Sequence, residues 1–419
     1  MNRPRPTPSH RAALVSLALM MGAAGCSAGS HSAAPTPQAG ARPAGVAVRL
    51  DYGSPAQLAQ AVAGGLDVFG VEMPQRRAFG RILPQDLSRL RALGLRFTVE
   101  ADTSPGFGVR NAFDAGFRTY EQVTADLKAL AARHPDLVTL RSAGPSWETT
   151  QGKADRQLWA VRITGKGDAS RRPAVAFTAN VHARELVPVE LAMALIKDLV
   201  EGYGKDAELT RLVDTRVIHV LPMANPDGHH QAEKGQDWRK NTHPFTGGVG
   251  VDLNRNFPFK WGLDNGGSSS QPSSQTYQGP AAASEPETQA LKAFLSGIPN
   301  LKIGMDYHAY SNLVMWPWGW TSAKPVDARL LEAIGRKLAS FNRYRPCQAN
   351  QLYPTCGTIR DYVYGELHVP YFTTEIGSRF DGFDPSFKRA QALIAENKPG
   401  AMYLLRIADD PSQVLREGR

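Results

Sequence analysis

The sequence predicts a large α/β domain with a mostly buried sheet, preceded by a small α+β domain. Two observations predict this fold class. From residue 119 onward, short β-branched and apolar runs alternate with segments whose apolar residues recur at helical spacing. Between residues 46 and 100, such runs follow the ferredoxin-like order strand, helix, strand, strand, helix, strand. A chain of 419 residues, 42% hydrophobic and 21% charged, is long and apolar enough for two folded domains.

The N-terminal residues predict export. Residues 1–25 combine a basic start, an apolar stretch too short to span a bilayer and a run of small residues, as in a signal peptide. Ala23-Ala24-Gly25-Cys26 resembles a bacterial lipobox, so we expect Cys26 to become a lipidated N-terminus. The alternative is cleavage nearby and secretion without an anchor. We therefore expect a periplasmic or cell-surface lipoprotein, or otherwise a secreted protein. Residues 26–45 are rich in Ser, Ala, Pro and Gly, which predicts a flexible tether.

The small domain is expected over residues 46–101. Its predicted strands are 46–51, 67–72, 79–83 and 96–100, and its predicted helices are 54–63 and 84–93. It contains no His and no Cys, so it supplies no candidate metal or thiol site. Residues 102–118 are broken by Pro105 and several glycines and predict a linker.

The large domain is expected over residues 119–407, followed by a tail at 408–419. Its predicted helices are 120–134, 188–202 and 285–295, and its predicted strands are 157–163, 174–181, 217–221, 301–306 and 371–375. The formal net charge of +9 is spread without a long Lys/Arg run, so we expect no nucleic-acid partner.

Cysteine parity predicts a disulfide. With Cys26 assigned to lipid, Cys347 and Cys356 remain as an even pair in a chain that we expect in an oxidising compartment. The alternative is two free buried thiols.

The most informative motif is His182-Ala183-Arg184-Glu185, which offers two zinc-type ligands three residues apart. It follows a predicted buried strand and precedes a predicted helix, the position where open α/β sheets bind their ligands. A catalytic zinc takes three protein ligands, and His308 at the end of another predicted strand is the third candidate. A lone histidine at such a place is more often an interior residue. Four further motifs lie between His182 and His308: N-P-D-G at 225–228, W-R-K-N at 238–241, D-L-N-R-N at 252–256 and S-E-P-E-T at 284–288.

With these motifs in this order, the chain resembles the zinc carboxypeptidases of the carboxypeptidase A/B type from about residue 119 to residue 407. The resemblance implies a mixed twisted sheet with helices on both faces and one zinc ion held by His182, Glu185 and His308. It implies that Glu375 is the general base that takes a proton from water. It implies that Arg239 stabilises the developing oxyanion.

The same resemblance assigns the substrate-binding residues. Asn254 and Arg255 match the pair that grips the terminal carboxylate, Tyr353 matches the tyrosine that closes over it, and Arg184 is a further substrate contact. Asp252 matches an acid that orients the first zinc histidine, with a turn-capping role as the alternative.

Arg360 departs from the common family pattern. The resemblance places it, just before Asp361, at the bottom of the family's pocket for the terminal side chain, where a buried Arg needs an anionic partner. We therefore expect a preference for peptides that end in Glu or Asp. The alternative is that Arg360 turns outward or is neutralised by Asp361, which leaves a broad pocket.

The leading interpretation is an exported, monomeric zinc metallocarboxypeptidase that acts on peptides. A second interpretation keeps the chemistry but directs it to cell-wall peptides, and a third is a lipoprotein that binds peptides without cutting them. His229, His230 and His243 could form a second metal site, although surface histidines are the default. Residues 316–320 are expected to pack below the site, with a sugar-stacking platform as the alternative. The small domain resembles the pro-segment of the family, and it could cover the cleft or be a permanent companion.

Overall fold

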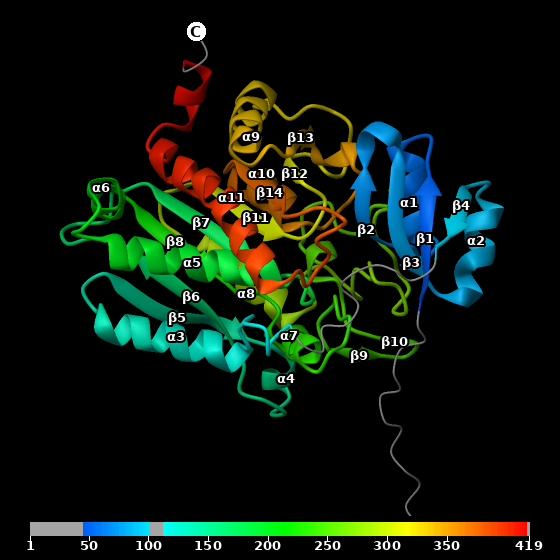
Figure 1. The fold of residues 1–419 in the computed structure, drawn as a ribbon, viewed down its shortest axis with the longest axis horizontal. Helices are drawn as coiled ribbons and strands as arrows, with labels where there is room; N and C mark the ends of the chain where they lie inside the picture. The colour runs from blue at the N-terminus through cyan, green and yellow to red at the C-terminus, as the bar shows by residue number, and fades with distance from the viewer. Residues whose placement is uncertain (1–44, 101–111, 417–419) are drawn as a thin grey trace, which may run out of the picture. The chain divides into compact units, whose positions relative to one another are not determined.

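The computed structural model describes residues 45–100 and 112–416 (Figure 1). The predicted signal peptide, Cys26, nearly all of the tether and most of the predicted linker lie outside the described residues. No helix among the described residues is long and apolar enough to cross a membrane.

The small N-terminal sheet has the predicted ferredoxin-like order. Its strands pair antiparallel in the order β2-β3-β1-β4. The strands are β1 (Val46–Asp51), β2 (Asp67–Glu72), β3 (Arg77–Ile82) and β4 (Arg96–Val99), and the helices are α1 (Pro55–Ala63) and α2 (Leu87–Ala92). The side chain of Ser54 caps α1 by accepting a hydrogen bond from the backbone of Gln57. Leu50, Leu58 and Leu90 are buried between sheet and helices and form the core of this part.

The large sheet is mixed, as predicted from the resemblance. Its eight strands follow the order β13-β12-β14-β11-β7-β8-β6-β5. The central strands β14, β11, β7 and β8 are parallel, whereas β6 pairs antiparallel with β8, β5 with β6, and β12 with β14. The strands are β5 (Val138–Pro145), β6 (Gln157–Ile163), β7 (Ala174–Ala179), β8 (Val217–Leu221), β11 (Leu301–His308), β12 (Leu313–Trp316), β13 (Arg345–Gln348) and β14 (Tyr371–Glu375). A separate two-stranded ribbon pairs β9 (Pro244–Phe245) with β10 (Gly248–Val249).

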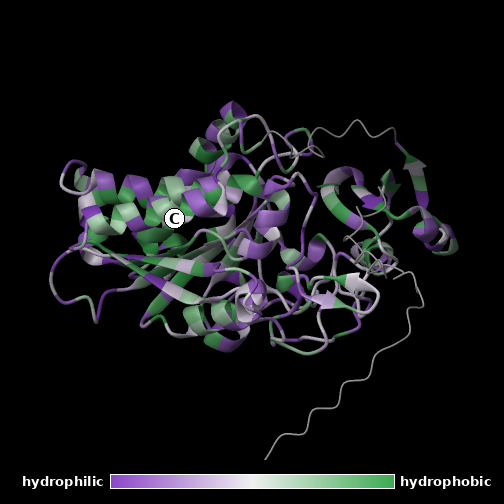
Figure 2. Ribbon diagram, turned by 90° about the horizontal axis from the view of Figure 1, so that it is seen from below, coloured by the Kyte–Doolittle hydropathy of each residue, from purple (hydrophilic) through white to green (hydrophobic). Residues whose placement is uncertain are grey.

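Helices cover both faces of the large sheet, because alternate residues of its central strands point to opposite sides. In β7, Val175 and Phe177 belong to one hydrophobic cluster, and Ala174 and Ala176 belong to the other. The first cluster includes residues of α3 (Tyr120–Arg133), α5 (Leu186–Gly202), α6 (Ala207–Thr215), α9 (Ala328–Asn342) and α11 (Phe387–Ile407). The second includes residues of α8 (Pro286–Ser296) and α10 (Ile359–Leu367). Two short helices, α4 (Trp147–Thr150) and α7 (Pro226–Glu233), lie in connecting segments. In Figure 2 the strands of this sheet are mostly green, while the helices mix green and purple, as amphipathic helices do.

The predicted disulfide is wrong, because Cys347 and Cys356 are free thiols. Cys347 lies on β13 and packs into a small apolar cluster with Leu313 and Met315. Cys356 instead has its Sγ atom 2.9 Å from Oγ of Ser268. Each thiol therefore has its own buried surroundings. A count of cysteines carries no information about such packing.

Candidate active site

The three predicted zinc ligands lie at the carboxyl ends of two adjacent strands, β7 and β11. His182 and Glu185 occupy the turn between β7 and α5, and His308 is the last residue of β11. Asn180 reverses the chain after β7 with a positive φ of 59°, a conformation that Asn adopts more readily than most residues. Its Nδ2 atom lies within hydrogen-bonding distance of the backbone oxygens of His182, Ala183 and Glu185. Asn180 thus holds the zinc-binding turn in shape, a role that no sequence motif indicates.

The ligand atoms converge on one point. Nδ1 of His182 lies 2.8 Å from Oε1 of Glu185, and Nδ1 of His308 lies 3.1 Å from Oε2 of Glu185. The two Nδ1 atoms are 3.1 Å apart, and all three residues are buried. Two imidazole nitrogens and one carboxylate oxygen are the donor set of a catalytic zinc site, so these residues fit that ion. Burial alone would raise the pKa of Glu185, but the facing histidines hold it below its usual range.

Each histidine makes a second contact with a carboxylate of its own. Nε2 of His182 lies 3.1 Å from Oδ1 of Asp252, as the resemblance implied, and Nε2 of His308 lies 2.6 Å from Oδ2 of Asp306. Asp306 is not among the site residues predicted from the sequence. Asp252 also accepts hydrogen bonds from Nε and Nη2 of Arg239 at 3.2 and 2.9 Å, so it fixes the predicted oxyanion residue as well.

Glu375 ends β14 beside His308 in the parallel register and lines the same pocket. Among residues 45–100 and 112–416, its carboxylate has no hydrogen bond or ion pair. Burial raises the pKa of Glu375 to about 7; His308 opposes this shift, and Glu185 adds to it. A carboxylate that is unpaired and titrates near neutrality can accept a proton from water.

The predicted terminal-carboxylate clamp is also assembled. Asn254 and Arg255 lie on a short 3₁₀ turn, Leu253–Arg255, whose start is capped by Asp252. Nη2 of Arg255 donates a hydrogen bond to the hydroxyl of Tyr353 at 3.2 Å. All three residues line the same pocket as the metal ligands and add a cation and hydrogen-bonding groups to it.

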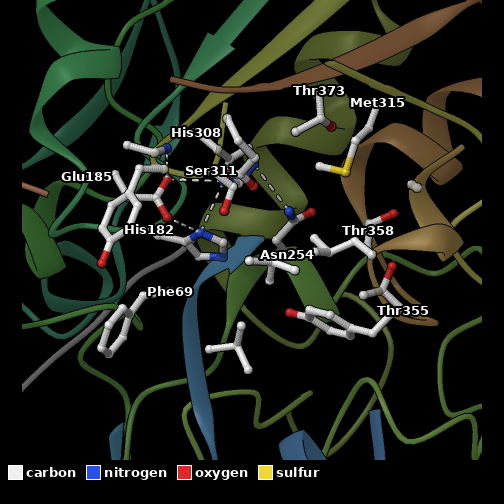
Figure 3. Close-up of a pocket in the computed structure, with 18 of the residues that line it drawn as sticks. Phe69, His182, Glu185, Asn254, His308, Ser311, Met315, Thr355, Thr358 and Thr373 are labelled. Atoms are coloured by element: carbon white, nitrogen blue, oxygen red, sulfur yellow. Dashed lines mark hydrogen bonds and ion pairs between the residues drawn. The ribbon is translucent and has the colours of Figure 1, made fainter. Parts of the chain in front are cut away.

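Arg360 lies in the same pocket, buried rather than turned to solvent. Figure 3 shows the metal ligands on one side and Thr355, Thr358 and Thr373 on the other, with Asn254 between them. Nε of Arg360 lies 3.2 Å from Oδ1 of Asp361, and Nη1 donates to Oγ1 of Thr373 at 3.2 Å. This part of the pocket is therefore lined by a guanidinium and by three residues that carry hydroxyl groups.

Arg184 does not line this pocket. Its guanidinium makes a bidentate pair with Asp67 of the N-terminal sheet, at 2.7 and 2.9 Å, and a further bond to Asp237 at 3.0 Å. Next to Asp67 on β2, Val68 and Phe69 line the pocket together with the catalytic groups. The N-terminal sheet therefore occupies space beside the metal ligands and holds a residue that the resemblance assigned to substrate binding.

The other candidate features lie apart from this site. Nε2 of His229 lies 3.0 Å from the backbone oxygen of Arg118, and Nδ1 of His243 lies 3.0 Å from Glu285. Within the described ranges, His182, Glu185 and His308 are the one group of three side chains close enough to hold a metal. In the segment 316–320, Trp318 stacks on Phe259 with ring centroids 5.3 Å apart, which is packing as expected.

Comparison with known proteins gives consistent similarities. A family model described as zinc carboxypeptidase matches residues 123–399. A zinc carboxypeptidase of Saccharothrix mutabilis subsp. capreolus is 31% identical over 385 residues, covering 85% of this chain and 87% of that protein. Carboxypeptidase A2 of Mus musculus is 30% identical over 258 residues, covering 61% of this chain and 59% of that protein. The crystal structure of carboxypeptidase A from Helicoverpa armigera shares the fold, with a TM-score of 0.75 and 24% identity over 87% of this chain and 97% of that chain.

Proposed function

Because the chain belongs to the zinc carboxypeptidase family and is thus a metallocarboxypeptidase, we propose that its preferred substrates are peptides that end in Glu or Asp. The observation that carries this proposal is the buried guanidinium of Arg360 in the pocket beside the metal ligands. A guanidinium recognises a carboxylate through charge-assisted hydrogen bonds.

The contacts of Arg360 decide how strong this preference can be. Asp361 pairs with Nε, so much of the charge of Arg360 is balanced within the pocket wall. Asp361 is itself held by the backbone amides of Gly319 and Trp320, at 2.8 and 3.2 Å. Within the described ranges, Nη2 of Arg360 has no hydrogen-bond partner. The preference for an acidic side chain therefore rests on donation from Nη2 and from the pocket hydroxyls, rather than on net charge.

The remaining residues act around the scissile bond. His182, Glu185 and His308 would hold the zinc ion, which would supply Lewis-acid chemistry toward water and the carbonyl group. Glu375 takes a proton from the attacking water and delivers it to the leaving amine. Arg239, fixed by Asp252, stabilises the negative charge that develops on the carbonyl oxygen.

Substrate binding is assigned to the clamp. Asn254 and Arg255 bind the terminal carboxylate, and Tyr353 closes over it from its hydrogen bond with Arg255. This arrangement requires a free terminal carboxylate and explains why the enzyme would act from the end of a peptide.

The proposal is tested with peptides that differ only in the last residue. We expect kcat/KM to be highest for Glu and Asp, and the preference to be lost in Arg360→Met. Similar kcat/KM values for all last residues, unchanged in Arg360→Met, would contradict the proposed acidic preference. Cutting of purified cell-wall peptides with no cutting of linear peptides would favour the cell-wall interpretation instead.

We further propose that the N-terminal sheet restrains the enzyme by occupying the cleft. Val68 and Phe69 line the catalytic pocket, Asp67 binds Arg184, and Tyr353 packs against the core of the N-terminal part. A peptide that occupies the clamp would have to displace these groups. We expect limited proteolysis within residues 101–118 to raise activity, whereas equal activity before and after cleavage would contradict this role.

We also propose that the chain is exported, anchored through Cys26 and monomeric. The support for export and for the anchor is the sequence of residues 1–26 alone. A Cys26→Ala variant that still fractionates with membranes would contradict the anchor, and the mass in solution of the chain without residues 1–26 tests the monomer.

A further inference from the structure

We propose that Asp306, held in place by Thr178 and Tyr371, is a positioning residue that fixes His308 for metal binding. The four side chains form one buried chain of contacts that spans three neighbouring parallel strands, β7, β11 and β14. This role concerns the metal site and does not depend on the substrate preference proposed above.

The register of the sheet creates the chain of contacts. Thr178 on β7 is directly opposite Asp306 on β11, so their side chains emerge on the same face. Oγ1 of Thr178 donates to Oδ1 of Asp306 at 2.7 Å, and the hydroxyl of Tyr371 lies 3.0 Å from the same Oγ1. His308 is two residues beyond Asp306 and therefore shares that face, with its Nε2 atom 2.6 Å from Oδ2 of Asp306.

Gly304 makes room for Tyr371. It precedes Asp306 by two residues on the same face of β11, and a Cβ atom built on it would lie 2.2 Å from Cε2 of Tyr371. Because no side chain is present at Gly304, the aromatic ring can lie over the strand and bring its hydroxyl to Thr178. The glycine is thus part of the same arrangement.

In the row of contacts from Tyr371 through Thr178 and Asp306 to His308, one arrangement of the hydrogen atoms satisfies every contact. The single hydroxyl hydrogen of Thr178 is given to Asp306, so Tyr371 must donate to Thr178. Asp306 is then an acceptor on both oxygens, which places the ring hydrogen of His308 on Nε2. The other nitrogen, Nδ1, keeps its lone pair and points at Glu185 and His182.

Asn254 is the other group near this nitrogen, with its Nδ2 atom 3.3 Å from Nε2 of His308. Nε2 can carry one hydrogen, and the carboxylate at 2.6 Å is the nearer acceptor. A histidine hydrogen-bonded to a carboxylate is oriented and made a more basic ligand. Both zinc histidines therefore have their own carboxylate, Asp252 for one and Asp306 for the other.

The test is the zinc dissociation constant of the full chain, measured by competition with a chromogenic chelator. We expect Asp306→Asn to raise this constant by about 10- to 100-fold. Thr178→Val removes the bond to the carboxylate of Asp306 together with the bond from Tyr371, whereas Tyr371→Phe removes the latter alone. Both should raise the constant by about 2- to 10-fold, Thr178→Val by the larger factor. The cobalt-substituted Asp306→Asn variant should also show a changed visible absorption spectrum, which reports the ligand geometry directly.

Two matched controls separate this role from general loosening of the sheet. Thr374→Val removes a buried strand hydroxyl that contacts Sδ of Met305, and Tyr307→Phe removes a buried hydroxyl that has no partner within the described ranges. We expect neither to change zinc affinity. An unchanged constant in Asp306→Asn overturns the proposal, and so does an equal loss of affinity in the controls. If Asp306→Asn does not fold, the zinc dissociation constants of Thr178→Val and Tyr371→Phe are compared with those of the controls instead, and unchanged constants overturn the proposal.

Discussion

Replacing Asp67 with Ala should open the cleft of the uncleaved chain and raise its peptidase activity. Both oxygens of Asp67 accept hydrogen bonds from Arg184, at 2.7 and 2.9 Å, in buried surroundings. The next two residues of β2, Val68 and Phe69, line the catalytic pocket. The contact with Arg184 therefore holds in place the strand that a peptide would have to displace.

The expected rise in activity depends on the contacts that Arg184 keeps after Asp67 is replaced. Leaving a buried charge wholly unpaired costs about 3–5 kcal/mol. Arg184 keeps its bond to Asp237 at 3.0 Å, so we take a smaller loss of about 2–3 kcal/mol for the docked state. Since about 1.4 kcal/mol is a factor of ten, the open fraction should rise about 30- to 150-fold while the closed state prevails.

The assay is kcat/KM of the uncleaved chain, measured separately on several N-blocked dipeptides that differ in the last residue. Asp51→Ala is the matched control, because Asp51 lies in the same N-terminal sheet but forms an exposed pair with Arg77 at 3.4 Å. The reasoning is refuted if Asp67→Ala is no more active than wild type, or if Asp51→Ala activates the chain equally.

Three other predictions follow from named contacts. Arg360→Met should lower kcat/KM for peptides ending in Glu by about 10- to 100-fold and leave those ending in Leu nearly unchanged, and a parallel loss for both would contradict the pocket assignment. Burial, with Asp227 adding to it, raises the pKa of Glu287 from 4.5 to about 8, so the folded chain retains a proton that the unfolded chain releases. Stability should therefore fall as pH rises from about 5 to 8, by up to about 1.4 kcal/mol per pH unit, and urea midpoints should show a smaller slope in Glu287→Gln; an unchanged slope would exclude Glu287 as the cause. Because Cys347 and Cys356 are free, a reducing agent should leave the melting temperature unchanged, and a lower value in the reductant would indicate a disulfide.

The sequence predicts the elements whose signals are local. Strands such as Gln157–Ile163 and Val217–Leu221 are bounded as predicted, because each is a short apolar run flanked by breakers. Helix α11 escaped prediction, since Pro399 and Gly400 favour a break that the packing of Leu393 and Leu404 overrides. β13 contains Pro346 and is four residues long, so its pattern is too weak to be identified from sequence.

The site divides in the same way. His182, Glu185 and His308 were found because they sit in motifs at strand ends. Asp306 was not, because the contact with Thr178 that holds it depends on the pairing of β7 with β11, which no local pattern reveals. The partner of Arg184 was missed for a similar reason, since Asp67 lies 117 residues away in the sequence.

The measurement that tests the central claim most directly is mass spectrometry of peptide products. The zinc-loaded chain, before and after limited proteolysis within residues 101–118, is incubated with peptides that differ only in the last residue. The account predicts loss of one C-terminal residue at a time, fastest from Glu and Asp, stopped by a chelator and slowed about 100- to 10,000-fold in Glu375→Gln. Cleavage inside the peptides, or full activity in Glu375→Gln, would contradict it.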